Sequence, residues 1–152
     1  MNKTILVTGS SRGLGATIAK TLSQQGYNII INYYKNKSLA EDLVSDIGSD
    51  HAIAIQADVT NRNDIDHLIE QATQYFGKID VVINNALVGF KFDPTQQKSF
   101  AELAWDDYQQ QIDGTLKAAF NVTQSVMPQF LERQQGIIIS IGTNLYQNPV
   151  VP

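Results

Sequence analysis

The sequence predicts an α/β fold, in which a doubly wound parallel sheet lies between helices. Two observations lead to this prediction. Short runs rich in Ile and Val alternate along the chain with longer segments of helical periodicity. The short runs are continuously apolar, which is typical of parallel strands that are buried on both faces. Strands that alternate with helices in this way favour right-handed crossovers and a single sheet.

The predicted strands are short and aliphatic, and turn-forming residues separate them from the helical segments. Ile and Val dominate them, as expected for β structure in a buried sheet. The strands are predicted at residues 3–8, 28–32, 52–56, 79–84 and 136–141.

The first two helical segments show both periodicity and end signals. Leu14, Ile18 and Leu22 lie four positions apart, which places them on one face of a helix. In the second segment, Ser38 and Glu41 form a capping box, in which each side chain accepts a backbone N–H group at the helix start. A glycine follows each segment where a helix would end.

The third and fourth helical segments are longer. An apolar stripe predicts a helix over residues 64–76. After a loop over residues 87–99, a long helical segment covers about residues 101–133. Pro128 lies inside it, and we expect this proline to kink or divide the helix, because proline removes a helical hydrogen bond.

Composition and charge exclude several classes of protein. The length of 152 residues suits one domain, and 43% apolar with 17% charged residues suits a compact globule. We see no signal peptide and no run near the ~18 apolar residues of a membrane span, so we expect a cytoplasmic protein. The absence of Cys excludes thiolate metal sites, and His51 and His67 lack spaced partners, so no metal is expected. The net charge of -4 argues against nucleic-acid binding.

The strongest functional motif is the glycine-rich turn between the first strand and the first helix. Phosphate binding needs backbone N–H groups that approach an anion closely and a helix N-terminus that points at it. Glycine permits both the tight turn and the close approach. No Gly-Lys-Ser/Thr follows, which excludes a P-loop. The alternative is a glycine-rich turn without a ligand. The expected cofactor-binding residues of this turn are Gly9, Ser11, Arg12, Gly13, Leu14 and Gly15.

The glycine spacing, Thr-Gly-x-x-x-Gly-x-Gly, resembles that of the short-chain dehydrogenases/reductases. Asp58 and Val59 follow the third strand, where that family holds the adenine ring. Asn84-Asn85-Ala86 ends the fourth strand, as in the family, and residues 57–85 are similar to bacterial 3-oxoacyl-carrier-protein reductases. The resemblance covers the whole chain and implies a single NADP-binding Rossmann domain over residues 1–152. Family members are longer, so we expect the fold to be incomplete at its C-terminus.

The end of the second strand bears on the choice between NAD and NADP. An NAD enzyme usually has an acid there, which binds the ribose 2′-hydroxyl and would repel a 2′-phosphate. This chain has Asn32 and Tyr33 at that place, followed by Lys35, and no acid. Arg12 in the glycine-rich turn suits a phosphate. We therefore predict NADP(H); the alternative is that Arg12 and Lys35 are solvated surface charges.

The resemblance implies a catalytic group of Asn, Ser, Tyr and Lys. In it, the Tyr is the acid/base, the Ser binds the substrate carbonyl, and the Asn supports a water relay. Thr143 takes the place of the Ser and is preferred to Ser140, which lies inside the fifth strand. Thr115 stands in the place of the Asn, which calls the usual relay into question, and Gly114 beside it favours an opened helix. Leu87 replaces a family glycine near the nicotinamide, so it must point away or reshape the pocket.

The family's Tyr-x-x-x-Lys pair is missing. It would lie near position 156, beyond Pro152. Tyr33 and Lys37 have the right spacing, but they lie on the adenosine side, and we interpret them as a coincidence. The chain alone is therefore expected to be inactive by the family's mechanism.

Three functions remain open. The first is NADP(H)-dependent reduction of a carbonyl, favouring a 3-oxoacyl thioester on acyl carrier protein in fatty acid synthesis, by a homo-oligomer (dimer or tetramer). The second is a non-catalytic dinucleotide-binding protein or inactive fragment, suggested by Thr115, Thr143 and Leu87. The third is a methyltransferase with a nucleoside cofactor, against which the Asp58-Val59 and Asn84-Asn85-Ala86 motifs speak. Neither nucleic acid nor a membrane is an expected partner.

Overall fold

The computed structural model describes residues 2–87 and 98–143, and within them one sheet of five parallel strands has the order β3-β2-β1-β4-β5. Val7 of the central strand lies opposite Ile31 on one side and Ile83 on the other. This strand order confirms the predicted doubly wound sheet. The strands are β1 (Thr4–Val7), β2 (Asn28–Tyr33), β3 (Ala52–Gln56), β4 (Val81–Asn84) and β5 (Ile137–Ser140).

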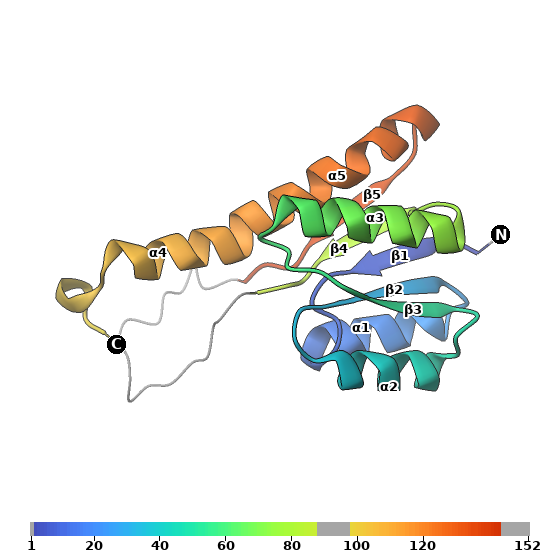
Figure 1. Ribbon diagram of the computed structural model, residues 1–152, viewed down its shortest axis with the longest axis horizontal. Coiled ribbons are helices and arrows are strands. Elements are labelled where there is room, and N and C mark those ends of the chain that lie inside the picture. Colours follow the sequence, from blue (N-terminus) through green and yellow to red (C-terminus); the bar gives the residue numbers. More distant parts are fainter. Residues whose placement is uncertain (1, 88–97, 144–152) are drawn as a thin grey trace.

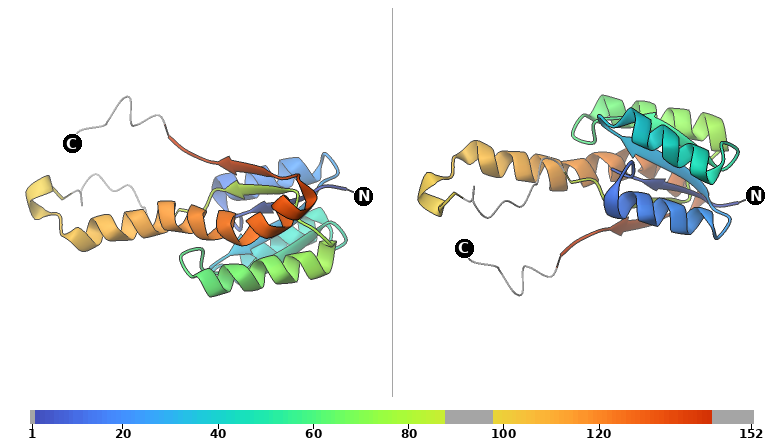
Figure 2. Two further views of the ribbon diagram at one scale, coloured as in Figure 1. Left: turned by 90° about the horizontal axis from the view of Figure 1, so that it is seen from above. Right: turned by 90° about the horizontal axis from the view of Figure 1, so that it is seen from below.

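Helices cover both faces of the sheet (Figure 1, Figure 2). Helices α1 (Gly13–Ser23) and α2 (Lys37–Ile47) lie on one face, and α3 (Arg62–Phe76) and α5 (Ala118–Arg133) lie on the other. Neighbouring residues of a strand point to opposite faces. Leu6 of β1 therefore packs in the core with α3 and α5, while Ile5 packs with α1 and α2. This double burial explains why the strand sequences are apolar throughout.

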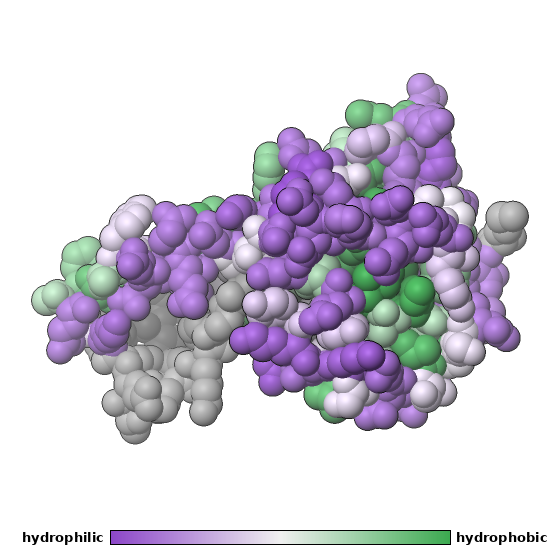
Figure 3. All heavy atoms as spheres, in the orientation of Figure 1, coloured by the Kyte–Doolittle hydropathy of each residue, from purple (hydrophilic) through white to green (hydrophobic). Residues whose placement is uncertain are grey.

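Helix α3 shows how the sequence pattern places a helix on the sheet. Ile65, Leu68 and Ala72 are buried on its inner stripe. The side chain of Asn61 accepts the N–H group of Asn63 (3.0 Å) and so caps the N-terminus. Figure 3 shows hydrophilic residues over the outer surface of α3 and apolar residues beneath it. The cap starts the helix at Arg62, ahead of the predicted residue 64.

The start of α2 differs from the sequence prediction. Its N-cap is Asn36 and its first residue is Lys37, so the predicted capping box of Ser38 and Glu41 lies inside the helix and is wrong. Glu41 instead forms an ion pair with Lys37, in which Oε1 of Glu41 lies 3.5 Å from Nζ of Lys37. Residues four apart on a helix lie on the same face and can pair in this way.

The long segment before β5 is not one helix. A 3-10 turn, η1 (Phe100–Glu102), precedes α4 (Trp105–Ile112), and the π-helical turn η2 (Asp113–Lys117) joins α4 to α5. Gly114 is buried in η2, in accord with the expected opening of the helix there. Figure 1 shows α4 continuing beyond the carboxyl ends of the strands. Most of the loop predicted over residues 87–99 lies outside the described residues.

Pro128 lies inside α5 and does not divide it, so the predicted division is wrong. Proline removes one hydrogen bond from a helix. The buried side chains of Val122, Val126 and Phe130 hold the helix against the sheet on either side of that position. Tertiary packing of an apolar face supplies most of a helix's stability, so it outweighs the lost bond.

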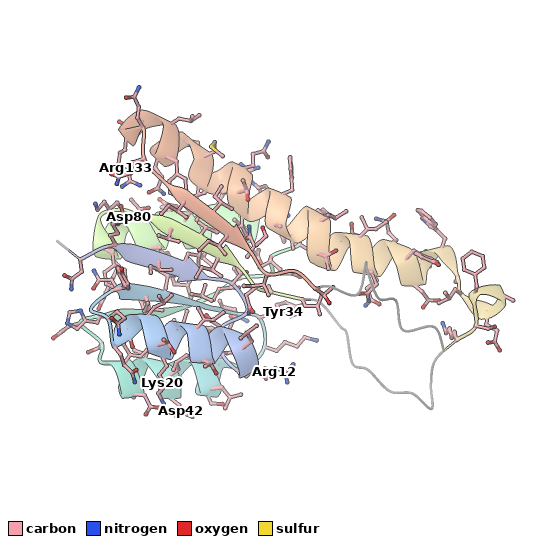
Figure 4. The ribbon with its side chains drawn as sticks, turned by 180° about the vertical axis from the view of Figure 1, so that it is seen from behind. Arg12, Lys20, Tyr34, Asp42, Asp80 and Arg133 are labelled. Atoms are coloured by element: carbon pink, nitrogen blue, oxygen red, sulfur yellow. The ribbon has the colours of Figure 1, made fainter. Side chains whose placement is uncertain are left out.

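A buried carboxylate ties α5 to the amino ends of the strands. Asp80 accepts the N–H group of Thr4 (3.0 Å) and pairs with Arg133 of α5 (2.9 Å) and with Lys78 (3.2 Å). Figure 4 shows Asp80 and Arg133 together at the end of the sheet opposite Arg12. Burial by itself raises the pKa of the Asp80 carboxyl group. The hydrogen bonds and the two cations together lower this pKa by more than burial raises it, so the pKa lies below its ordinary value. We call this group the Asp80 clasp.

Candidate dinucleotide site

The glycine-rich turn leads from β1 into the N-terminus of α1. Gly9 and Gly13 have φ angles of 61° and 57°, which favour glycine. A Cβ at Gly15 would lie 2.6 Å from Asn85 Nδ2 and 2.7 Å from the carbonyl oxygen of Gly9, so no larger residue fits. Arg12 is the N-cap and supplies no side-chain cap. The first N–H groups of α1 therefore have neither an intrahelical acceptor nor a capping side chain, and an anion is a suitable partner.

The side chain of Asn32, in β2, is hydrogen-bonded to the backbone of the glycine-rich turn. Its Oδ1 accepts the N–H group of Gly9 (3.0 Å), and its Nδ2 donates to the carbonyl of Ala57 (3.1 Å). The side chain is 2% exposed. Asn32 was predicted to bind the cofactor. The structure places it at the cavity wall with both amide atoms already bonded to the protein, so its position suits fixing the loop.

Thr8 and Asn85 join the carboxyl ends of β1 and β4. The hydroxyl of Thr8 accepts the N–H groups of Asn85 and Ala86, both at 3.0 Å. The side chain of Asn85 donates to the carbonyls of Thr8 (2.9 Å) and Gly9 (3.3 Å). A Cβ at Gly9 would lie 2.9 Å from the Cα of Ala86, so the two segments are in close contact. Asn85 and Ala86 of the Asn84-Asn85-Ala86 motif thus support the glycine-rich turn, while Asn84 points to Thr123.

A cavity of about 630 Å³ lies beside the turn, over the ends of β2 and β3, and we call it the loop-side cavity. It brings together three of the six predicted residues of the turn, Gly9, Ser11 and Arg12, with both predicted motifs at the ends of β2 and β3. Gly13 and Gly15 do not line it, and Leu14 lines the second cavity described below. Figure 4 shows Arg12 and Tyr34 at this end of the sheet. Its lining includes Gly9, Ser11, Arg12, Asn32, Tyr33, Asp58, Val59 and Ala86, together with Tyr34, Lys35, Asn36, Thr60 and Gln110.

The charges of the loop-side cavity are mostly positive. Arg12 is exposed, and among the described residues its guanidinium has no ion-pair partner. Lys35 lies over the ring of Tyr34, 5.2 Å from its centre. Asp58 already accepts the N–H and hydroxyl of Thr60 (2.9 and 2.7 Å). Two cations and one engaged carboxylate make this end of the site suitable for phosphate.

A second cavity, of about 590 Å³, lies over the ends of β4 and β5, and we call it the β5-side cavity. Thr115 and Thr143, both predicted as catalytic, line it together, although they are far apart in the sequence. Leu14, Asn84 and Asn85 also line it. None of its described lining residues is titratable in the physiological range, and apolar side chains from Leu87, Leu116, Ala118, Ala119 and Ile141 make up much of the wall.

The polar groups of the β5-side cavity are not equivalent. The hydroxyl of Thr115 donates to the carbonyl of Gln111 (2.6 Å) within its own helix. Asn84 is 9% exposed; its Nδ2 lies 3.4 Å from the hydroxyl of Thr123, and its buried Oδ1 has no partner among the described residues. Ser140 lines the cavity as well as Thr143. The preference for Thr143 over Ser140 therefore stays a prediction.

Sequence reasoning missed several lining residues. Tyr34 follows β2 directly and Asn36 lies three residues after its end, so their position just beyond a strand could have identified them. Gln110 lies on α4 and reaches the loop-side cavity only through the placement of that helix, for which the sequence contains no signal. Tyr33 lines the loop-side cavity and Lys37 pairs with Glu41, so the Tyr33–Lys37 spacing has no part in the β5-side cavity.

Two further findings concern metal sites and membrane-spanning helices among the described residues. Among residues 2–87 and 98–143, no cluster of three or more His, Asp or Glu side chains is arranged to hold a metal ion. Across the same ranges, no helix combines the length and the apolar character needed to cross a bilayer.

Known proteins resemble this chain in both sequence and structure. The family model described as short chain dehydrogenase matches residues 3–151. The 3-oxoacyl-(acyl-carrier-protein) reductase FabG of Staphylococcus epidermidis is 40% identical over 143 residues, which cover 93% of this chain and 56% of that protein. The 3β-hydroxysteroid dehydrogenase 1 of Eggerthella lenta is 34% identical over 144 residues, covering 93% and 53%.

Two solved structures have the same fold. The closed form of serine dehydrogenase complexed with NADP+ has a TM-score of 0.82 at 28% identity, covering 97% of this chain and 57% of that one. A short chain dehydrogenase from Burkholderia cenocepacia in complex with NADP has a TM-score of 0.81 at 29% identity, covering 98% and 58%. This chain thus spans a little over half the length of these relatives. Its glycine-rich turn, its strand order and the match of the family model over residues 3–151 together show that the chain belongs to the short-chain dehydrogenase family.

Proposed function

We propose that this chain binds NADP(H) and forms the cofactor-binding part of a carbonyl reductase. The observation that carries the proposal is the pairing of an uncapped α1 N-terminus with a loop-side cavity that contains Arg12 and Lys35. The turn suits a pyrophosphate, because no side chain caps the first N–H groups of α1 and they have no intrahelical acceptor. Two structural relatives are NADP complexes, which supports the choice of cofactor.

The expected roles of the loop-side residues follow from their positions. The N–H groups at Gly13, Leu14 and Gly15 would hold the pyrophosphate at the helix N-terminus. Arg12 and Lys35 would bind a 2′-phosphate, since a guanidinium pairs with phosphate in a planar, bidentate way. Asp58-Val59 would border the adenine, as the resemblance to the family implies. Bound NADPH supplies the hydride for carbonyl reduction.

The β5-side residues would then face the carbonyl substrate. Thr143, with Ser140 as the alternative, would donate its hydroxyl hydrogen to the carbonyl oxygen. Thr115 is engaged with Gln111, so it is less suited to hold a relay water than an Asn would be. The similarity to FabG proteins supports a 3-oxoacyl thioester on acyl carrier protein as the substrate. A homo-oligomer and a cytoplasmic location remain part of the same proposal.

A second candidate is dinucleotide binding without catalysis. The hydroxyl of Thr115, which is bonded within its own helix, favours this candidate. Both candidates predict NADP(H) binding and differ in turnover. The family match argues against the methyltransferase alternative.

The test is a titration of NADPH and NADH into the wild-type chain and the Arg12→Ala variant. We expect the wild type to prefer NADPH, and Arg12→Ala to weaken NADPH at least about tenfold while NADH changes by less than about twofold, because a charge-assisted bond is lost. Lys20→Ala removes a cation from the same helix and serves as the control, since Lys20 pairs with Asp46 outside the cavities. Equal affinity for both cofactors in the wild type would contradict the proposal.

Turnover separates the two candidates. Acetoacetyl-CoA is a simple 3-oxoacyl thioester, and oxidation of NADPH in its presence can be followed by absorbance. Oxidation of NADPH at a rate above background would support the reductase. Binding of NADPH without oxidation would support the non-catalytic candidate.

A further inference from the structure

The two cavities of the site meet at a boundary that Leu87 dominates. Of the described residues, Val59, Ala86 and Leu87 line both cavities. Val59 is 6% exposed and Ala86 has only a methyl group, whereas Leu87 is 54% exposed. Leu87 therefore presents the largest free apolar side chain at the passage from one cavity to the other.

The backbone that leads to Leu87 is fixed. The hydroxyl of Thr8 accepts the N–H groups of the two preceding residues, Asn85 and Ala86, at 3.0 Å each. Close contact between Ala86 and Gly9 leaves this backbone little room to shift toward the turn. The position of Leu87 at the boundary is thus set by β1 and β4, the central strand and its neighbour.

The two cavities differ in the ligand chemistry that they favour. The loop-side cavity contains Arg12, Lys35 and Asp58, while the described lining of the β5-side cavity contains no titratable acid or base and exposes Leu14 and other apolar side chains. A ligand that fills both has a charged nucleotide end and an uncharged ring end. The uncharged end of such a ligand reaches the β5-side cavity past Leu87.

We infer that Leu87 is a binding residue for the uncharged ring half of a dinucleotide, where that half enters the β5-side cavity, and that it favours the whole dinucleotide over its adenosine half. This inference rests on the proposed function. A half-exposed leucine that loses its remaining contact with water contributes apolar burial to binding. The glycine that the family has at this position has no side chain with which to make this contact.

The experiment compares Leu87→Ala and Leu87→Met with the wild type, using NADPH and adenosine 2′,5′-bisphosphate, which represents the adenosine half alone. For Leu87→Ala we expect NADPH to bind about five- to tenfold more weakly and the bisphosphate to change by less than about twofold. Leu87→Met keeps most of the apolar volume and is expected to stay within about twofold of the wild type for both ligands. Leu39→Ala is the matched control, because Leu39 is 45% exposed and lines neither cavity.

The outcomes separate this inference from the proposed function. If the wild type binds NADPH and Leu87→Ala binds it equally well or more tightly, the role of Leu87 is refuted while the proposed function stands. Equal weakening of both ligands also refutes it, because that result indicates a general change in the loop. If the wild type binds neither ligand, the proposed function fails and this inference fails with it. Thermal melting of each variant confirms that it is folded.

Discussion

The two ends of the candidate site are built differently. At the loop side, Asn32, Thr8 and Asn85 are bonded to the backbone around the glycine-rich turn, and Asn32 and Thr8 are buried. At the β5 side, the isoleucines of β5 are exposed, with Ile137 at 50% and Ile139 at 44%. Aliphatic strand sequences of the same kind are therefore buried in β1, which leads into the glycine-rich turn, and exposed in β5.

The difference follows from the positions of the strands in the sheet. β1 is central and has β2 and β4 beside it, whereas β5 pairs only with β4 among the described residues. A central strand has its backbone groups paired on both sides, and an edge strand presents unpaired groups. The glycine-rich turn is thus supported by this chain's own contacts, while the β5-side cavity borders a surface that the described residues leave open.

The largest expected effect is a steric one at the loop side. Gly15→Ala would place a Cβ 2.6 Å from Asn85 Nδ2 and 2.7 Å from the carbonyl oxygen of Gly9. We expect the free energy of unfolding to fall by about 3 kcal/mol, because backbone atoms have to shift. NADPH affinity is expected to fall at least about tenfold, because the turn proposed to hold the pyrophosphate moves. Urea denaturation and a binding titration measure the two effects.

The matched change at the β5 side is Gly142→Ala. Among the described residues, no heavy atom lies within 4 Å of a Cβ built there, and the φ angle of Gly142 is not in the positive region. Its free energy of unfolding is expected to stay within about 0.5 kcal/mol of the wild type. Similar destabilisation by both substitutions would contradict the contrast between the two ends.

The next effect concerns the Asp80 clasp, which fixes α5 and therefore the β5-side wall. Asp80→Asn removes a charge that Arg133 and Lys78 share. We expect a loss of about 2 kcal/mol in the free energy of unfolding at pH 7, because two cations lose a partially buried partner. Chemical denaturation measures this loss. Ser125→Ala, which removes the hydrogen bond to the exposed Asp66, is expected to cost less.

The same clasp predicts a pH dependence. The folded-state pKa of Asp80 is lowered, so its contribution is fully present above the unfolded-state value of about 4 and is lost as the pH falls through the folded-state value. Between pH 5 and more acidic conditions, the wild type is therefore expected to lose more stability than Asp80→Asn. Parallel stability curves for the two proteins over this range would show that the carboxylate is not stabilised by the clasp.

The smallest effect compares one methylene group in the two regions. Ile30→Val, at a position that is 0% exposed, is expected to cost about 1 kcal/mol because it leaves a small cavity. Ile139→Val, at a position that is 44% exposed, is expected to cost less than about 0.5 kcal/mol. The difference in denaturation midpoint between the two variants measures how much less tightly the side chain of Ile139 in β5 is packed than that of Ile30 in β2. Equal costs would mean that β5 is as well covered as β2.

Local patterns were sufficient to predict the strands and the position of the glycine-rich turn between β1 and α1. Each of these features depends on residues that are adjacent in the chain. A short, continuously apolar run between turn-forming residues is typical of a strand that is buried on both faces. The start of α2 and the continuity of α5 were predicted wrongly. The first depends on the chain before Lys37, and the second depends on the packing of Val126 and Phe130 on the sheet. Neither effect is visible in a short sequence window.

For the site, the sequence alone determined the chemical inventory: glycines at the spacing of the turn, Arg12 without a nearby acid, and threonines in place of a serine and an asparagine. Only the tertiary structure decided which of these groups meet. It brought Thr115 and Thr143 into one cavity, engaged Asn32 beneath the turn, and placed Leu87 between the two cavities. The physical reason is that residue type and local spacing are properties of the chain, whereas proximity depends on which strands pair and how the helices pack on them.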